Sequence, residues 1–331
     1  MKRRQSLKLI SLCALGVIPA LMMGSAVAQQ ASDYPSRPVM VAVGYPAGGP
    51  ADMAARIVTE ELAKLWKQPI VIENKPGANA TIATADVARA TPDGYKLLLA
   101  AGNHTTNKFV YKDLRYGVED SFVPVALISQ TPTVLATNID FPANTVPELI
   151  ELLRKNPGKY TYSSTGYGST SHLAAELFKQ ATNTDITHVP YKGVGQAVTD
   201  IMGGNIDMVF PSLGSVMTFF DSGKLKPIAV ATPQRLPELK DVPTFSEQGL
   251  PGFEVQTWYG LLAPAGTPKE IVDKINRDVN QVLSNPDVQK KLLIQGTYAA
   301  PRTPEQFKEQ IHAEVKRMEA LSKRVDLSAG K

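Results

Sequence analysis

Residues 39–65 read VMVAVGYPAGGPADMAARIVTEELAKL, an apolar run followed by a Gly/Pro loop and an amphipathic segment. The apolar run, residues 39–43, predicts a short strand. Apolar side chains then recur at helical spacing over residues 53–65, and Pro50 suits the first turn of a helix. Asp52 places a negative charge beside the positive end of the helix dipole. The segment therefore predicts a strand, a loop and a helix, as in the opening unit of an α/β domain.

The glycine loop between this strand and this helix can bind an anion. The first N–H groups of a helix have no partner within the helix, and a glycine loop lets a ligand approach them. Gly48-Gly49 is followed by Pro50-Ala51-Asp52 rather than by Lys-Ser/Thr, and no third glycine completes a dinucleotide fingerprint. A known nucleotide loop is therefore excluded. Two interpretations stay open for this loop alone: an anion site, and a tight βα turn that binds nothing.

The first residues have the pattern of a signal peptide. Residues 2–4 are basic, residues 7–23 are apolar, and Ala26-Val27-Ala28 is a small-x-small cleavage site. We expect residues 1–28 to be removed, so that the mature chain begins at Gln29 in the periplasm.

The export route stays open between the Sec and twin-arginine pathways. Residues 3–8 resemble a twin-arginine signal that lacks its usual aromatic residue. An uncleaved membrane anchor is the alternative, and the cleavage site argues against it.

Composition excludes several classes of function. Cys13, the only cysteine, lies in the predicted leader, so the mature chain has no disulfide, thiol nucleophile or cysteine metal site. The four basic residues of the leader account for the whole net charge of +4, and the mature chain is balanced. Without a basic run we expect no nucleic-acid binding. A mature chain of roughly 300 residues is long enough for two lobes.

The alternation of predicted strands and helices indicates an α/β fold with two lobes. We expect the chain to cross between the lobes at Gln130-Thr131-Pro132 and to return within the apolar and aromatic residues 253–262. The predicted first lobe holds residues 29–129 and 257–331, and the second lobe holds residues 130–256. No later segment is apolar enough to span a membrane.

A second loop repeats the opening design in the predicted second lobe. Residues 164–171 form a hydroxyl-rich glycine loop between a predicted strand at 159–163 and a predicted helix from 172 to 178. In open α/β sheets, ligands bind at the carboxyl ends of the strands. We expect the two loops to close on one anionic group from opposite sides. Backbone N–H groups and hydroxyls satisfy a carboxylate without an arginine, at roughly 1.5–3 kcal/mol per charge-assisted bond.

The case for catalysis is poor. The histidines are His104, His172, His188 and His312, and none forms a zinc-protease pair or stands near a nucleophile-elbow pattern. His172 falls in the first predicted turn after the serine loop, where we expect a packing or capping role. We predict no metal site and no cofactor.

Several short motifs, in the same order from about residue 34 to about residue 307, resemble the Bug-type solute-binding proteins, the extracytoplasmic receptors of tripartite tricarboxylate transporters. The motifs are YP at 34–35, YPAGGPAD at 45–52, ENKPGA at 73–78, PDGY at 92–95, HVPYKG at 188–193 and GLLAPAGTP at 260–268.

The resemblance implies a type II periplasmic-binding-protein fold, in which two α/β lobes close like a Venus flytrap on a ligand in the cleft. It also implies a carboxylate ligand, often held through bridging waters, and delivery to a two-component membrane permease. The ligand-facing loops carried onto this chain are Ala47-Gly48-Gly49 with Asp52 nearby, residues 78–81, and residues 165–170 with His172.

This chain departs from the family pattern in those loops. The family usually has Phe-Pro-Pro-Gly-Gly where residues 45–49 read YPAGG, and it usually has glycines at Asn79, Ala80, Ala83 and Thr165. The added side chains should narrow or re-aim the pocket, so the ligand of any one relative does not transfer.

The candidate ligand-binding residues lie in these loops and at strand ends. They are Tyr45, Ala47, Gly48, Gly49, Asp52, Ala78, Asn79, Thr81, Asn103, His104, Thr105, Thr165, Gly166, Tyr167, Ser169, Thr170, His172, Tyr191 and Phe210.

The leading hypothesis is a monomeric periplasmic receptor, not an enzyme, that captures a small organic carboxylate for a membrane permease. One alternative is a lyase or dehydratase on the same fold, with Asp52 or His172 as acid/base. Another is a sensor subunit that presents its liganded form to a membrane kinase. The sequence does not decide which acid is bound. Tyrosines near the cleft suit an aromatic or heteroaromatic carboxylate, and small dicarboxylates are an equal alternative.

Overall fold

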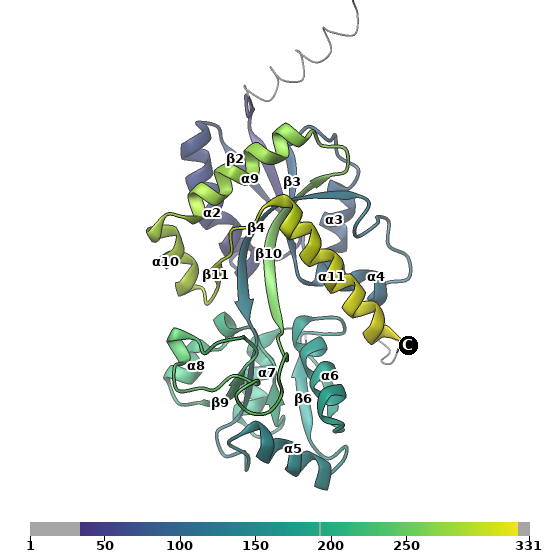
Figure 1. Ribbon diagram of the computed structural model, residues 1–331, viewed down its shortest axis with the longest axis vertical. Coiled ribbons are helices and arrows are strands. Elements are labelled where there is room, and N and C mark those ends of the chain that lie inside the picture. The colour runs from purple at the N-terminus through teal and green to yellow at the C-terminus, as the bar shows by residue number, and fades with distance from the viewer. Residues whose placement is uncertain (1–33, 192, 324–331) are drawn as a thin grey trace, which may run out of the picture.

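The protein folds into two α/β bodies joined by a pair of long strands (Figure 1). The computed structural model describes residues 34–191 and 193–323, so the predicted leader lies outside the described residues. Each body is built on one sheet. We call the body with the six-stranded sheet the first lobe and the body with the five-stranded sheet the second lobe.

The sheet of the first lobe has the strand order β11-β4-β10-β3-β1-β2. β1 is parallel to β2 and β3, whereas β10 is antiparallel to β3 and β4. The apolar run of β3 is almost fully buried, as expected of a strand covered on both faces. The strands are β1 (Val39–Val43), β2 (Ile70–Asn74), β3 (Lys96–Ala101), β4 (Phe122–Pro132), β10 (Gln256–Pro264) and β11 (Tyr298–Ala299).

Helices cover both faces of this sheet. One core joins the sheet to α2, α9 and α10, and another joins its opposite face to α3 and α11. The helices are α2 (Pro50–Trp66), α3 (Thr81–Val87), α4 (Asn103–Val110), α9 (Lys269–Leu283), α10 (Pro286–Ile294) and α11 (Pro304–Ser322).

The second lobe has the strand order β7-β6-β8-β5-β9. Its core lies between the sheet and α5 and α6, and a smaller cluster covers the other face beneath α7 and α8. The elements are β5 (Val134–Asn138), α5 (Val146–Lys155), β6 (Thr161–Ser164), α6 (Thr170–Thr182), β7 (Thr187–Pro190), α7 (Val194–Met202), β8 (Met208–Val209), α8 (Met217–Asp221) and β9 (Leu225–Val230).

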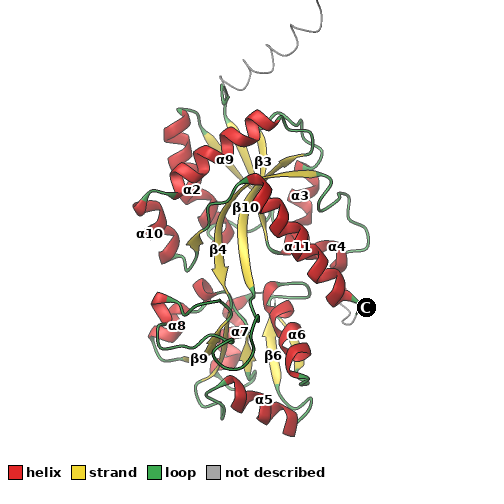
Figure 2. Ribbon diagram, viewed as in Figure 1, coloured by secondary structure: helices red, strands yellow, loops and turns green. Residues whose placement is uncertain are grey.

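The connection between the lobes is a two-stranded ribbon. Figure 2 shows β4 and β10 as long strands that run from the upper body toward the lower one. The two strands pair down to Gln256 opposite Pro132, and the Thr133 N–H then donates to the Val255 carbonyl at 3.2 Å. The lobe boundaries predicted at 129/130 and 256/257 fall in this ribbon and stay a prediction.

The structure corrects several expectations from the sequence. Residues 103–107 form a polar cluster at the carboxyl end of a predicted strand, but in the structure they begin helix α4, because their side chains find buried partners that local propensity does not reveal. The apolar residues 206–210 predict a strand, but only Met208–Val209 form one, β8, and the sequence did not predict α8. Thr267-Pro268-Lys269-Glu270 has the pattern of a helix cap, but Thr267 does not cap α9; its hydroxyl donates to the Pro264 carbonyl at 2.8 Å.

Two capping patterns in the sequence, TVPE at 145–148 and TPEQ at 303–306, do begin helices. The side chain of Thr145 caps α5 by accepting from the Glu148 N–H, and Thr303 forms a capping box with Gln306 at the start of α11. Within residues 34–191 and 193–323, no helix combines the length and the apolar character needed to cross a membrane.

Candidate functional site

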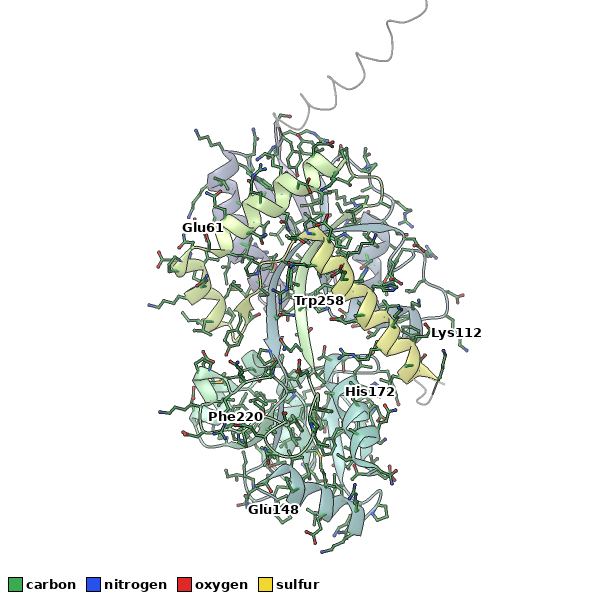
Figure 3. All side chains as sticks on the ribbon, viewed as in Figure 1. Glu61, Lys112, Glu148, His172, Phe220 and Trp258 are labelled. Carbon is green, nitrogen blue, oxygen red and sulfur yellow. The ribbon has the colours of Figure 1, made fainter. Side chains whose placement is uncertain are left out.

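A cavity of about 240 Å³ lies between the lobes, beside the ribbon. Residues of the β1–α2 loop, β3 and β10 line it from the first lobe, and residues of the β6–α6 loop and α7 line it from the second. In Figure 3, Trp258 of β10 lies in the upper body and His172 of α6 lies near the top of the lower body, on either side of this junction. The cavity therefore lies where the topology brings strand ends of both sheets together.

Asp52 shapes the β1–α2 loop rather than the cavity surface. Its carboxylate, only 1% exposed, accepts from the Gly48 N–H at 2.9 Å, Arg56 Nε at 2.8 Å and Asn74 Nδ2 at 2.9 Å. Burial alone raises the pKa of Asp52, but the hydrogen bonds from Arg56, Gly48 and Asn74 outweigh it and hold that pKa below its usual value. The carboxylate stays ionised and fixes the loop that carries Gly48 and Gly49.

A strained turn forms the next part of the wall. The 3₁₀ turn Ala78–Ala80 has φ of 45°, 54° and 70°, all in the left-handed region that non-glycine residues rarely adopt. The Asn79 carbonyl accepts from Asn103 Nδ2 at 2.8 Å and from Asn107 Nδ2 at 3.1 Å. Tyr45 donates its hydroxyl to Asn103 Oδ1. These bonds hold the turn in place, which explains why α4 is buried and polar.

The β6–α6 loop of the second lobe is held by its own side chains. Ser169 caps α6 by accepting from the His172 N–H at 3.3 Å, and its hydroxyl donates to the Gly166 carbonyl at 2.7 Å. Nδ1 of the buried His172 accepts from the Gly168 N–H at 3.2 Å. Burial lowers the pKa of His172, so the ring is neutral and serves as an acceptor.

The N-termini of α2 and α6 both reach the cavity, one from each lobe. The residues that line it there are Gly49, Pro50 and Ala51 of α2 and Ser169, Thr170 and Ser171 of α6. Each helix N-terminus carries the equivalent of roughly half a positive charge and unpaired N–H groups. Among the described residues, no lysine, arginine or histidine lines the cavity. The arrangement can hold an anionic group between neutral donors.

The structure brings together only part of the predicted site. The predicted residues that line the cavity are Tyr45, Gly49, Asn79, Asn103, Thr165, Ser169 and Thr170. The predicted residues that do not line it are Ala47, Gly48, Asp52, Ala78, Thr81, His104, Thr105, Gly166, Tyr167, His172, Tyr191 and Phe210.

Some of the latter are held in packing or hydrogen bonds elsewhere. His104 is buried, with Nε2 2.9 Å from the Val118 carbonyl. Phe210 is fully buried in the core of the second lobe, and the Tyr191 hydroxyl donates to Asp200 at 2.6 Å. These side chains follow strands that end near the cleft, but their own directions take them away from it.

Other lining residues were not among the named candidates, although Pro46, Pro50 and Ser171 lie in the two loops that were expected to bind the anion. These other lining residues are Pro46, Pro50, Ala51, Ala101, Ser171, Val194, Pro211, Ser212, Thr257 and Tyr259. Residues 253–262 were interpreted only as a crossing. The hydroxyls at 257 and 259 stand at i and i+2, the spacing that puts two strand side chains on one face, and that signal could have found them.

The family of this chain follows from comparison with known proteins. A family model described as Tripartite tricarboxylate transporter family receptor matches residues 54–327. A UPF0065 protein of Pseudomonas sp. strain P51, in the tcbD-tcbE intergenic region, is 34% identical over 307 residues, 92% of this chain and 91% of the relative. Protein BugT of Bordetella pertussis is 32% identical over 308 residues, 92% of this chain and 94% of its own.

Solved structures agree with this fold. One described as a periplasmic transporter has a TM-score of 0.79 and 41% identity, over 89% of this chain and 99% of that chain. R. palustris Rpa4515 with adipate has a TM-score of 0.79 and 34% identity, over 88% and 98%. MatC from Rhodopseudomonas palustris with bound malate has a TM-score of 0.76 and 34% identity, over 87% and 100%.

Two α/β lobes, a ribbon between them and a cavity at their junction define a periplasmic-binding-protein fold, as predicted. The chain belongs to the tripartite tricarboxylate transporter receptor family and is of the Bug type. Members of this family are solute-binding receptors.

Proposed function

We propose that this protein captures a small organic carboxylate in the cavity between its lobes. The observation that carries the proposal is the pair of helix N-termini, from α2 and α6, that reach one cavity from opposite lobes. Unpaired helix N–H groups and the helix dipole favour an anion there. Relatives solved with adipate and with malate support a carboxylate rather than another anion.

Capture involves closure of the lobes about the β4–β10 ribbon. The ribbon is the part of the described chain where both strands pass between the lobes, and a hinge needs only a few residues that absorb the backbone change. In our proposal the hinge lies near Gln130-Thr131 and residues 255–258. The closed monomer, exported to the periplasm after removal of residues 1–28, then delivers its ligand to a membrane permease.

The site supports a receptor without catalysis. The Asp52 carboxylate is committed to three hydrogen bonds, and Nδ1 of His172 is committed to the Gly168 N–H. Neither side chain lines the cavity, so neither is placed to exchange a proton with a ligand. We therefore expect the bound acid to be recovered chemically unchanged after incubation with the protein.

The first experiment is a thermal-shift screen of protein that begins at Gln29 against aliphatic, hydroxylated, amino-acid and aromatic carboxylates. A ligand at about a hundred times its Kd adds roughly 2.7 kcal/mol to the free energy of unfolding, which raises Tm by several degrees in a chain of this size. A shift with one subclass supports the proposal and identifies the chemical type of the acid.

If no acid of the panel raises Tm, while circular dichroism shows that the protein is folded, the result would contradict carboxylate capture. If an acid binds, a pull-down of the liganded protein with membrane extracts separates transport from sensing. In our proposal, liganded protein retains permease subunits, whereas retention of a membrane kinase would favour the sensor alternative.

A further inference from the structure

Two mostly buried side chains on β10 carry hydroxyls at the cavity. Thr257 and Tyr259 are each 8% exposed, and both line it. They stand at i and i+2 in one strand, so their side chains leave the same face, whereas Trp258 between them leaves the other face and donates to Glu314 at 2.8 Å. Among the described residues, neither hydroxyl has a hydrogen-bond partner.

Such groups are costly unless a ligand or water satisfies them. In the free protein, water in the cavity can satisfy both hydroxyls; a ligand that displaces this water without replacing its hydrogen bonds leaves each hydroxyl unsatisfied, at about 1–3 kcal/mol per group. The site therefore favours a ligand that completes them. β10 pairs with β4 at both residues and with β3 at Tyr259, so strand pairing rather than a loop places the two side chains.

Tyr45 provides the internal contrast. It also lines the cavity, but its hydroxyl already donates to Asn103 Oδ1, and Asn103 in turn holds the strained turn at Asn79. The Tyr45 hydroxyl is therefore committed to the wall. The Tyr259 hydroxyl is free to bind a ligand, and because burial raises the pKa of Tyr259 to about 12, it remains a neutral phenol that donates and accepts.

The surroundings of these hydroxyls are neutral as well. Ala101, Val194 and Pro211 line the same cavity, and no cationic side chain among the described residues does so. The two helix N-termini together supply roughly one positive charge, which one carboxylate uses. Among the described lining residues a second ionised group would find no counter-charge to offset its desolvation, whereas a neutral polar group needs only hydrogen bonds.

We propose that the ligand is a carboxylate with a second, uncharged hydrogen-bonding group, which Thr257 and Tyr259 bind. The inference rests on the proposed function and narrows it to a substrate class. A hydroxyl, carbonyl, amide or ring nitrogen fits this requirement. A purely aliphatic monocarboxylate leaves both hydroxyls unsatisfied.

Matched acids test this inference by calorimetry on protein that begins at Gln29. One series is hexanoate, 6-hydroxyhexanoate and adipate, and the other is benzoate, 4-hydroxybenzoate and terephthalate. In at least one series we expect the hydroxy acid to bind about tenfold more tightly than its parent acid, since one added hydrogen bond is worth about that factor. We also expect it to bind more tightly than the dicarboxylate.

Single substitutions then test whether the hydroxyls of Thr257 and Tyr259 cause the preference for the hydroxy acid over its parent acid. Tyr259→Phe and Thr257→Val keep the shape of each side chain and remove only the hydrogen-bonding hydroxyl, so each should reduce the tenfold preference to about threefold or less. Tyr45→Phe is the matched control: it loosens the wall and should weaken the hydroxy acid and its parent acid by the same factor.

The outcomes separate this inference from the proposed function. A preference below threefold in both series, a tenfold preference that survives in both β10 variants, or tightest binding of the dicarboxylates would overturn the inference while carboxylate capture stands. Failure of every acid to bind folded protein would instead overturn carboxylate capture, and this inference with it.

Discussion

Asp52 is a single side chain on which the geometry of the first ligand-facing loop depends. We predict that Asp52→Asn lowers the free energy of unfolding near neutral pH by about 1.5–3 kcal/mol, because one of the two carboxylate oxygens that accept from Gly48, Arg56 and Asn74 becomes a donor. Disorder in the loop should also cost about 1.4 kcal/mol of binding free energy, which raises the Kd of the ligand about tenfold. Urea denaturation and calorimetry measure the two effects.

The effect should depend on pH in a defined direction. Because the folded-state pKa of Asp52 is depressed, its contribution to stability is present above its ordinary pKa near 3.8 and is lost as the pH falls below it. The difference between wild type and Asp52→Asn should therefore shrink in acid. Asp273→Asn, an exposed partner of Lys269, is the control and should change stability by less than about 0.5 kcal/mol. An equal loss in both variants would contradict the role of Asp52.

For single residues, the sequence predicts which residue types lie near the site better than it predicts where their side chains point. Asp52 was recognisable as the acid that complements the start of a helix, and the structure adds that it holds Gly48. His104 and Phe210 follow strands that point toward the cleft, yet both side chains are buried elsewhere. The direction of a side chain depends on tertiary packing, which no local pattern contains.

The close approach of the β1–α2 loop to the 3₁₀ turn is a property of two elements together. A Cβ at Gly44 would lie 2.3 Å from the Cβ of Ala80 and 2.7 Å from its Cα. We predict that Gly44→Ala separates the loop from the turn, costs about 1–3 kcal/mol of stability, and weakens ligand binding. Thermal unfolding and calorimetry of the variant measure both.

Gly195→Ala is the matched control for this prediction. A Cβ at Gly195 in α7 meets nothing within 4 Å, and alanine is the better helix former there, so stability should be unchanged or rise by up to about 1 kcal/mol. Normal stability and affinity in Gly44→Ala would show that the loop and turn can separate without cost.

Elements with apolar periodicity were predictable, and α4 was not. β1, α2 and β3 follow from their apolar spacing, because burial of one face decides their conformation. Helix α4 has the sequence NHTTNKFV, whose asparagines and threonines are poor helix formers. It forms because Asn103 and Asn107 bind the turn at Asn79, a contact between segments far apart in sequence.

The two lobes contact each other directly, so closure around a ligand depends on how well the facing surfaces of both lobes fit together. Thr106 of α4 donates to the Gly168 carbonyl at 3.1 Å, and a Cβ at Gly168 would lie 2.3 Å from Cγ2 of Val110. We predict that Gly168→Ala hinders closure and raises the Kd of the ligand about tenfold or more, while each lobe stays folded. Calorimetry, with circular dichroism of the free protein, measures this.

A second substitution separates closure from local strain. Val110→Ala in the Gly168→Ala background removes the clash but leaves alanine at a φ of +72°, so it should restore part of the affinity. No recovery at all would mean that strain in the loop, rather than contact between the lobes, causes the loss.

The two-lobe plan was predictable because alternating strands and helices are interrupted at two places where the chain can cross. The strand order was not, since nothing local indicates that β10 inserts between β3 and β4. The spacing of Thr257 and Tyr259 places them on one face of a strand, but nothing local shows that this face meets the β1–α2 loop, about 210 residues earlier, and the β6–α6 loop, about 90 residues earlier.

The helix N-termini that face the cavity have an evolutionary consequence. A peptide N–H is present whatever the side chain, proline excepted, so ordinary missense mutation in these loops does not delete the donors that face an anion. Gene duplicates can therefore accumulate changes at wall positions such as Thr257 and Tyr259 and acquire new substrates without first losing the ability to hold a carboxylate. Receptors with this design can therefore diverge in substrate through their wall residues, while the helix N-termini that hold the carboxylate stay the same.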